Sequence, residues 1–239
     1  GEPVIAAKVA GGGQDLTVTI QIADPDSVNG KVQESTADES TAGITSALFG
    51  TVTGSLSLSA IYSFMGTRKG LKATPDATEN VGLLANTVAG GSAFTVQSAT
   101  FPDDVASGGT VTATSGNAGL LVGAVNDGAT LRVGSLNNVP TATIQSSNGS
   151  AGGVVGKIGS SNGATVEVTS AIDLSNLTVK GKAAGGFIGQ ATRLMLGAEN
   201  KKVTCPKTVG DATSGNVGGF IGEVSFGSSV EFTGNDQID

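Results

Sequence analysis

Oxygen-bearing side chains that could bind a hard cation cluster near the start of the chain, at Asp24, Asp26 and Asn29. Calcium ions prefer several carboxylate and carbonyl oxygens, so this cluster is a candidate calcium site. The spacing differs from that of an EF-hand loop, because Asn29 follows Asp26 by three residues instead of two. The segment is therefore predicted to be a turn capped by its own Asx side chains, with calcium binding left open.

Acid–base and nucleophilic chemistry have few candidate residues. The chain contains no histidine, which excludes a His-Glu-x-x-His zinc site and every nucleophile scheme that depends on histidine. A sugar-cleaving enzyme would need clustered carboxylates, whereas Glu167, Glu223 and Glu231 fall on different strand-like segments and are each predicted to be solvated surface charges. Cys205 is the single cysteine, and it is predicted to be a small buried hydrophobic residue. We therefore expect no catalytic, cofactor-binding or metal-binding residues.

Composition narrows the class of protein further. The formal net charge of −7 and the scattered lysines and arginines provide no basic stripe for a phosphate backbone, so no nucleic-acid partner is expected. There is no run of 18 apolar residues, so no membrane-spanning segment is predicted. With 38% hydrophobic residues and 38 glycines, the chain is too apolar for disorder and too rich in glycine for helices. Short strands joined by tight turns remain.

A five-residue motif recurs along the chain. Its clearest copies are Gly-Gly-Val-Val-Gly at residues 152–156 and Gly-Gly-Phe-Ile-Gly at residues 185–189 and 218–222, spaced 33 residues apart. Weaker copies lie upstream at residues 119–123, 82–86 and 47–50. Self-similarity at a fixed period of this length is typical of solenoid proteins.

Each repeat also contains three strand-like segments divided by Gly, Asn and Ser, such as residues 153–158, 165–169 and 177–181. These features predict an all-β fold, a right-handed parallel β-helix or related β-solenoid of about six coils. Residues 42–239 are expected to form the coils, with a period of about 33–37 residues. Residues 1–41 are expected to be a non-repetitive cap or cover with two strands, residues 3–10 and 16–23, joined by a glycine turn at residues 11–13.

The alternation of side chains assigns faces to the motif. Phe187 and Phe220 occupy the same place in successive repeats and are predicted to stack inside the solenoid. The opposite parity predicts an outward apolar row, whose members are Phe49, Ala85, Val122, Val155, Ile188 and Ile221. Such a row is too apolar to face water, so we expect the strands within residues 3–23 to lie across it. Asn80, Asn117 and Asn216 recur just before the motif and are predicted to form a structural corner.

The motif, followed by a Gly/Asn turn and a strand, resembles the GLUG-type repeats of large bacterial cell-surface proteins over about residues 42–235. Such repeats also occur in surface metallopeptidases that cleave immunoglobulin A. The resemblance implies the repeat region of an exported, adhesin-like bacterial protein located outside the cell or on its surface. The tyrosine-rich second segment typical of these repeats is missing, and residues 1–41 have no counterpart in them.

The function expected from these observations is a non-enzymatic structural or adhesive segment. Its partners would be a host or matrix protein or a glycan, and further repeats or domains of the same precursor, because the last unit ends before a third strand. One alternative is a carbohydrate-active β-helix enzyme, a polysaccharide lyase or hydrolase, which a groove with three or more convergent carboxylates would favour. A flat Ser/Thr/Asn surface would favour the adhesin.

A second alternative is an ice-binding β-solenoid. The threonine pairs at residues 17/19, 51/53 and 110/112 are not expected to recur at one position of the repeat, which argues against a regular ice-binding lattice.

Overall fold

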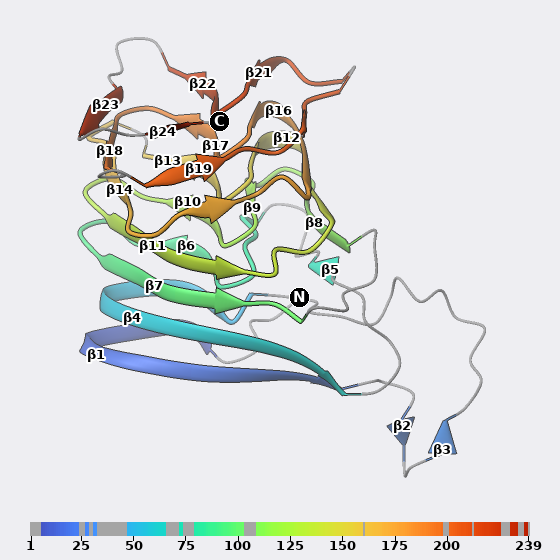
Figure 1. Ribbon diagram of the computed structural model, residues 1–239. Helices are drawn as coiled ribbons and strands as arrows, with labels where there is room; N and C mark the ends of the chain where they lie inside the picture. Colours follow the sequence, from blue (N-terminus) through green and yellow to red (C-terminus); the bar gives the residue numbers. More distant parts are fainter. Residues whose placement is uncertain are drawn as a thin grey trace.

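The computed structural model describes residues 6–23, 27–28, 31–32, 47–65, 72–73, 79–102, 109–159, 161–197, 201–211, 213–225, 230–233 and 237–238. Every regular element among them is a β-strand, and nearly all of the strands pair in parallel to form a β-solenoid (Figure 1). The exception is the antiparallel pair β2 (Ser27–Val28) and β3 (Lys31–Val32). The candidate calcium ligands Asp24, Asp26 and Asn29 lie outside the described residues.

The first stack of parallel strands is formed by the motif itself. Its members are β6 (Ala85–Val88), β10 (Val122–Val125), β13 (Val155–Ile158), β17 (Ile188–Ala191) and β22 (Ile221–Val224). The strands pair in strict register, so that the first residue of each lies beside the first residue of the next. Main-chain hydrogen bonds between coils therefore hold each copy of the motif directly beside the equivalent copy in the next coil.

The second stack follows the first around the solenoid. It contains β7 (Ala93–Thr100), β11 (Thr130–Asn137), β14 (Ala164–Val168), β18 (Leu194–Gly197) and β23 (Val230–Thr233). Within it, inward residues such as Phe94, Leu131 and Val166 are buried and alternate with half-exposed polar ones. This is the period of two expected of a strand with one solvated face.

A third stack completes the coil. It contains β5 (Lys72–Ala73), β8 (Gly109–Ala113), β12 (Ala142–Gly152), β16 (Leu177–Gly185) and β20 (Thr208–Val209). The short strands β9 (Ala118–Gly119) and β21 (Asn216–Gly218) extend it by pairing with the ends of β12 and β16. A small sheet of β15 (Ile172–Asp173), β19 (Lys202–Thr204) and β24 (Gln237–Ile238) lies between the second and third stacks in chain order.

The predicted all-β solenoid is confirmed, but its coil count differs. The described residues form about four complete turns instead of about six, and strands at both ends add incomplete coils.

The N-terminal segment belongs to the stack and does not cover it. β4 (Phe49–Met65) pairs with both β6 and β7, so one continuous strand spans the first and second stacks. β1 (Ala6–Ala23) pairs in parallel with β4 along its length, from Ala6 beside Phe49 to Ala23 beside Met65, and lies at the blue end of the stack in Figure 1. The expectation that residues 3–23 lie across an outward apolar row is therefore wrong. The physical reason is the open edge of β4, whose main-chain groups β1 satisfies.

The glycine turn expected at residues 11–13 is also wrong, because these residues lie within β1, where the register shifts between Gly12 and Asp15. Gly13 and Gly54 keep positive φ angles of 79° and 69° at the same bend of their strands. Later coils turn at glycines with similar angles, Gly91 and Gly128. Thus β1 and β4 bend at a position where the later coils make a turn between two separate strands.

The row that was predicted to face outward is buried. Phe49, Ala85, Val122, Val155 and Ile188 are at most 1% exposed, and Ile221 is half-buried at the last coil. Simple alternation fails because the chain reverses sharply within the motif, so that the end of the third stack packs against the first stack.

Glycine permits this close approach. A Cβ on Gly156 would lie 2.7 Å from the nitrogen of Ala118, and one on Gly189 would lie 2.7 Å from the nitrogen of Ala151. Two layers of main chain therefore meet here with no side chain between them.

The second glycine of the motif gives a matched test of this packing. A Cβ on Gly186 would overlap the carbonyl oxygen of Gly219 in the next coil, whereas a Cβ on Gly219 meets no atom of the described residues within 4 Å. We predict that Gly186→Ala lowers the free energy of unfolding by at least about 2 kcal/mol, and that Gly219→Ala changes it by less than about 0.5 kcal/mol. Denaturant unfolding measures both. Equal effects of the two substitutions would contradict the packing described here.

The interior contains two aromatic stacks. Phe187 and Phe220 lie in adjacent coils with ring centroids 5.0 Å apart and planes 3° apart, as predicted from their equivalent positions. Phe187 is fully buried and Phe220 is half-buried. Tyr62 stacks on Phe101 at 5.3 Å and donates a hydrogen bond from its hydroxyl to the carbonyl oxygen of Leu83 at 3.3 Å. Burial raises the pKa of Tyr62 above its ordinary value, so this hydroxyl stays protonated.

The difference in burial predicts unequal costs of truncation. Phe187→Ala should lower the free energy of unfolding by about 3–5 kcal/mol, the usual cost for a buried phenylalanine. Phe220→Ala should cost less, because solvent already reaches that ring. The midpoints of denaturant unfolding of the two variants, each compared with wild type, measure these costs. An unchanged midpoint for Phe187→Ala would show that this ring does not pack in the core.

Candidate functional site

A polar corner runs along the solenoid where the third stack meets the first. One column of this corner is formed by the residue two positions before the first glycine of each motif: Asn80, Asn117, Ser150, Ala183 and Asn216. The facing column is formed by the third residue of each first-stack strand: Thr87, Ala124, Lys157, Gln190 and Glu223. Strict register between coils therefore sets ten side chains in two facing columns.

The predicted asparagine corner is confirmed for the first two coils. The side-chain oxygen of Asn80 accepts hydrogen bonds from the main-chain nitrogen and the amide of Asn117, at 3.0 and 2.8 Å. The side-chain oxygen of Asn117 in turn accepts from the main-chain nitrogen of Ser150 at 3.1 Å. Asn216 occupies the same column, but its amide donates to Glu223 at 2.6 Å. Asparagine thus joins neighbouring coils at this corner.

Hydrogen bonds also cross between the two columns. The amide of Asn80 donates to Thr87 at 3.4 Å, and the hydroxyl of Ser150 donates to the Gln190 side-chain oxygen at 3.3 Å. The amide of Gln190 donates to the Glu223 carboxylate at 2.9 Å. Glu223 is therefore held by two amides, Gln190 and Asn216, as a hydrogen-bond acceptor.

A groove of about 460 Å³ opens along the upper part of this polar corner. Its lining includes two cationic side chains, Lys157 and Lys182, and one carboxylate, Glu223. Among the described residues neither lysine forms an ion pair. Three convergent carboxylates would have favoured a sugar-cleaving enzyme, and the part of the groove that the structure describes contains one. The described lining thus combines one carboxylate with two lysines and several amides.

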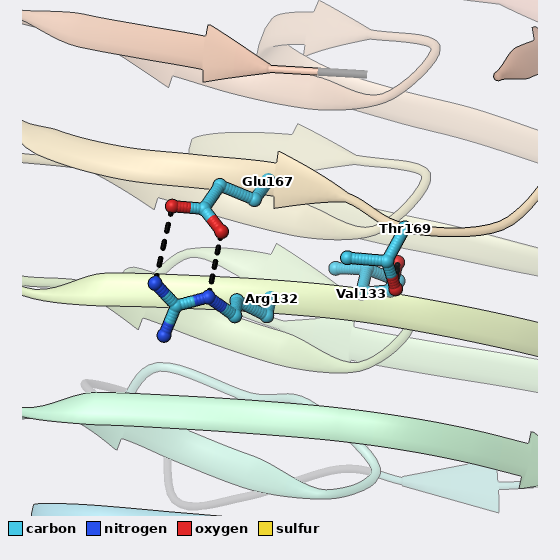
Figure 2. A network of polar contacts seen from close by, with 4 residues as sticks. All are labelled: Arg132, Val133, Glu167 and Thr169. Carbon is cyan, nitrogen blue, oxygen red and sulfur yellow. Dashed lines mark hydrogen bonds and ion pairs between the residues drawn. The ribbon is translucent and has the colours of Figure 1, made fainter. Parts of the chain in front are cut away.

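The other carboxylates named from the sequence lie elsewhere. Glu167 on β14 accepts a bidentate pair of hydrogen bonds from Arg132 on β11, at 2.6 and 3.2 Å, on the outer face of the second stack (Figure 2). Glu231 lies in the same stack, in register with Met195. The structure thus places Glu223 on the first stack and the other two on the second. Among the described residues, no group of three or more His, Cys, Asp or Glu side chains could hold a metal ion.

Cys205 is half-buried and packs against the core. Burial raises the pKa of its thiol to about 11, because the charged thiolate loses hydration there. The side chain is less buried than predicted, but it is a poor nucleophile at neutral pH, where the thiol predominates.

The outer face of the third stack carries a regular column of threonines. Thr110, Thr143, Thr178 and Thr208 lie in register on four successive strands, half-exposed or exposed. The threonine pairs at residues 17/19, 51/53 and 110/112 do not stack on one another, as expected, but Thr110 belongs to a column that the sequence did not predict. The spacing between coils varies here, so a fixed period hides the column, whereas hydrogen-bond register reveals it. The neighbouring outward column is mixed, with Thr112, Gln145 and Lys180.

The groove was not found from the sequence, although a signal for it existed. Its residues flank the motif, because Ser150, Ala183 and Asn216 precede the first glycine by two positions and Lys157, Gln190 and Glu223 follow the last glycine directly. Aligning whole repeats on the motif would have placed all six in two columns.

The chain matches no protein-family model, and no curated protein or solved structure matches it. The part of the chain that the structure describes contains no helix long and apolar enough to cross a membrane.

We predict that the Arg132–Glu167 ion pair contributes little to stability. The two side chains are 42% and 36% exposed, so water and salt screen their attraction. A double-mutant cycle with Arg132→Gln and Glu167→Gln should give a coupling free energy of about 0.2–1 kcal/mol that declines in 1 M salt, where the screening length is about 3 Å. A larger coupling that is insensitive to salt would mean that the pair is shielded from solvent.

Proposed function

We propose that this chain is a non-enzymatic structural and adhesive segment of an exported bacterial surface protein. The observation that carries the proposal is the polar corner, where register between coils arrays Asn, Ser, Thr and Gln side chains along the outside of a rigid solenoid. Such an array offers many hydrogen-bonding groups held at a fixed spacing. The chemistry suits recognition of a polar surface, since preorganised groups lose little entropy on binding.

Three further features support the same function. The repeated motif resembles the GLUG-type repeats of bacterial surface proteins. The outward columns of the second and third stacks are also mainly polar, as in Ser57, Thr95 and Arg132 or Thr110 and Thr143. The carboxylates Glu167 and Glu223 are both engaged in hydrogen bonds with neighbouring coils, a structural use that does not require catalysis. Its partners would be a host or matrix protein or a glycan, together with further coils of the same precursor.

A second candidate function is ice binding, which the threonine column of the third stack favours. Ice-binding surfaces need a flat, regular array, and this column supplies one regular row. Gln145 and Lys180 interrupt the neighbouring row, so the array is one column wide. Adhesion therefore remains the stronger proposal. The carbohydrate-active enzyme is weaker still, because its carboxylates do not converge.

Adhesion can be tested with beads that carry the full chain. We expect saturable binding to at least one member of a panel of matrix proteins and glycans, compared with beads that carry the same chain unfolded. Antibodies against the chain should also label intact, unpermeabilised cells of the source organism.

Two parallel assays separate the alternatives. New reducing or unsaturated sugar ends that disappear in Glu223→Gln would favour the enzyme, and arrest of ice growth that is lost in Thr143→Lys would favour ice binding. Binding no greater than that of the unfolded control, together with unlabelled cells, would overturn the adhesive proposal.

A further inference from the structure

The groove at the polar corner lies where one residue breaks the pattern of its column. Asn80, Asn117, Ser150 and Asn216 all present a polar side chain, whereas Ala183 presents only a methyl group. Ala183 lies in register between Ser150 and Asn216, and it lines the groove. The gap in the column is therefore a feature of this one coil.

The facing column does not fill the gap. Gln190 lies in that column, and its side chain accepts a hydrogen bond from Ser150 at 3.3 Å and donates to Glu223 and Ser225 at 2.9 and 3.4 Å. These bonds hold the Gln190 amide against the neighbouring coils. The wall of the groove is thus fixed before any ligand arrives, which lowers the entropy cost of binding.

Two lysines give the groove a local positive charge. Lys157 lies in the column opposite Ser150, and Lys182 directly precedes Ala183. Neither is neutralised by a carboxylate among the described residues, although the whole chain carries a net charge of −7. The ammonium groups are therefore available to an anion. Glu223, by contrast, places an acceptor at the other end of the groove, where Asn216 and Gln190 hold it.

We propose that this groove binds an acidic saccharide, a sugar that carries a carboxylate or sulfate group. Lys157 and Lys182 bind the acidic group, and the amides of Asn117, Gln190 and Asn216 with the carboxylate of Glu223 bind hydroxyls. The carboxylate would repel a densely charged polyanion, so the ligand carries its charge at the lysine end and neutral hydroxyls at the other. The volume of about 460 Å³ lies within the usual range for small-ligand sites, about 300–1,000 Å³.

This assignment rests on the proposed adhesive function and names the class of ligand for it. Among the residues that the structure describes, no aromatic side chain lines the groove, so recognition depends on hydrogen bonds and charge, and the binding of one site is weak. Several copies of the protein on one surface would raise the overall binding through multivalency.

The substitution Ala183→Asn tests the site directly. Ala183 is 3% exposed, so the melting temperature is the control that shows whether the fold is intact. The substitution fills the gap with the residue that Asn80, Asn117 and Asn216 already place in the same column. We would titrate the full ¹⁵N-labelled chain with cellobiouronate, a disaccharide with a single carboxylate, and follow amide shifts around Ser150, Ala183 and Asn216. Wild-type protein should show saturable shifts there, and Ala183→Asn should bind at least about tenfold more weakly with an unchanged melting temperature.

The lysines provide an independent arm of the test. Lys157→Gln and Lys182→Gln should each weaken binding about fivefold, the loss expected for one charge-assisted contact, and Lys207→Gln, outside the groove, should not. Cellobiose, the neutral counterpart of the probe, and inorganic sulfate complete the series. Both should bind much more weakly than cellobiouronate.

Four outcomes would overturn the site. These are shifts elsewhere, equal binding of the neutral sugar, equal binding of inorganic sulfate, or full binding by both Ala183→Asn and the lysine variants. If wild-type beads adhere to the panel of matrix proteins and glycans but cellobiouronate does not bind in the groove, the adhesive function stands while the groove falls. If no adhesion is found but cellobiouronate still binds in the groove, the reverse holds.

Discussion

Two layers of main chain meet at one edge of every coil with no side chain between them, and the rest of the solenoid depends on this contact. The first and last glycines of the motif make it sterically accessible, since a Cβ at Gly156 or Gly189 would strike the main chain of the preceding segment. The sharp reversal places two consecutive apolar residues in the interior, as in Val154 and Val155. The motif is therefore a packing device, and its recurrence sets where each coil begins.

Register follows from this device and gives the outer surface its order. Because each coil starts at the same point, a given position recurs directly above itself, and neighbouring side chains in a column form hydrogen bonds such as Asn80–Asn117. A column of like residues stabilises the stack, whereas a different residue within a column creates a feature that is confined to one coil. Ala183 opens a groove, and Arg132 beside Glu167 forms an ion pair where other coils present Ser57 and Thr95. The groove and the ion pair on this solenoid thus both occur where a residue differs from its counterparts in the other coils.

The fold could be predicted because the motif and the period of two are both local signals. Glycine spacing predicted parallel coils, and the equivalent positions of Phe187 and Phe220 predicted their stacking. The N-terminal coil could not be predicted in the same way. At the equivalent of the motif, β1 presents Ala6 beside Phe49 and lacks the flanking glycines, so that the repeat is visible only in the pairing.

Other features depended on contacts between coils. Strict alternation wrongly turned Val122 and Val155 outward, because it assumes a straight strand where the chain reverses. The threonine column was missed because coil length varies, and the groove was missed because an alanine carries no chemical signal of its own. Sequence patterns report what a residue brings to a site, but a groove is also defined by what a residue leaves unfilled.

The open space above Gly219 makes the last coil selective about what can join it. In the interior, the same space above Gly186 is occupied by the carbonyl oxygen of the next motif. An incoming segment must reverse its direction at this point. It must also carry the last glycine of the motif, since a Cβ at that position strikes the coil before it, as a Cβ on Gly222 would strike Ala184. Ordinary flat strands of unrelated proteins do not satisfy that requirement. The glycine motif thus restricts pairing at such an edge to segments that can make the same reversal.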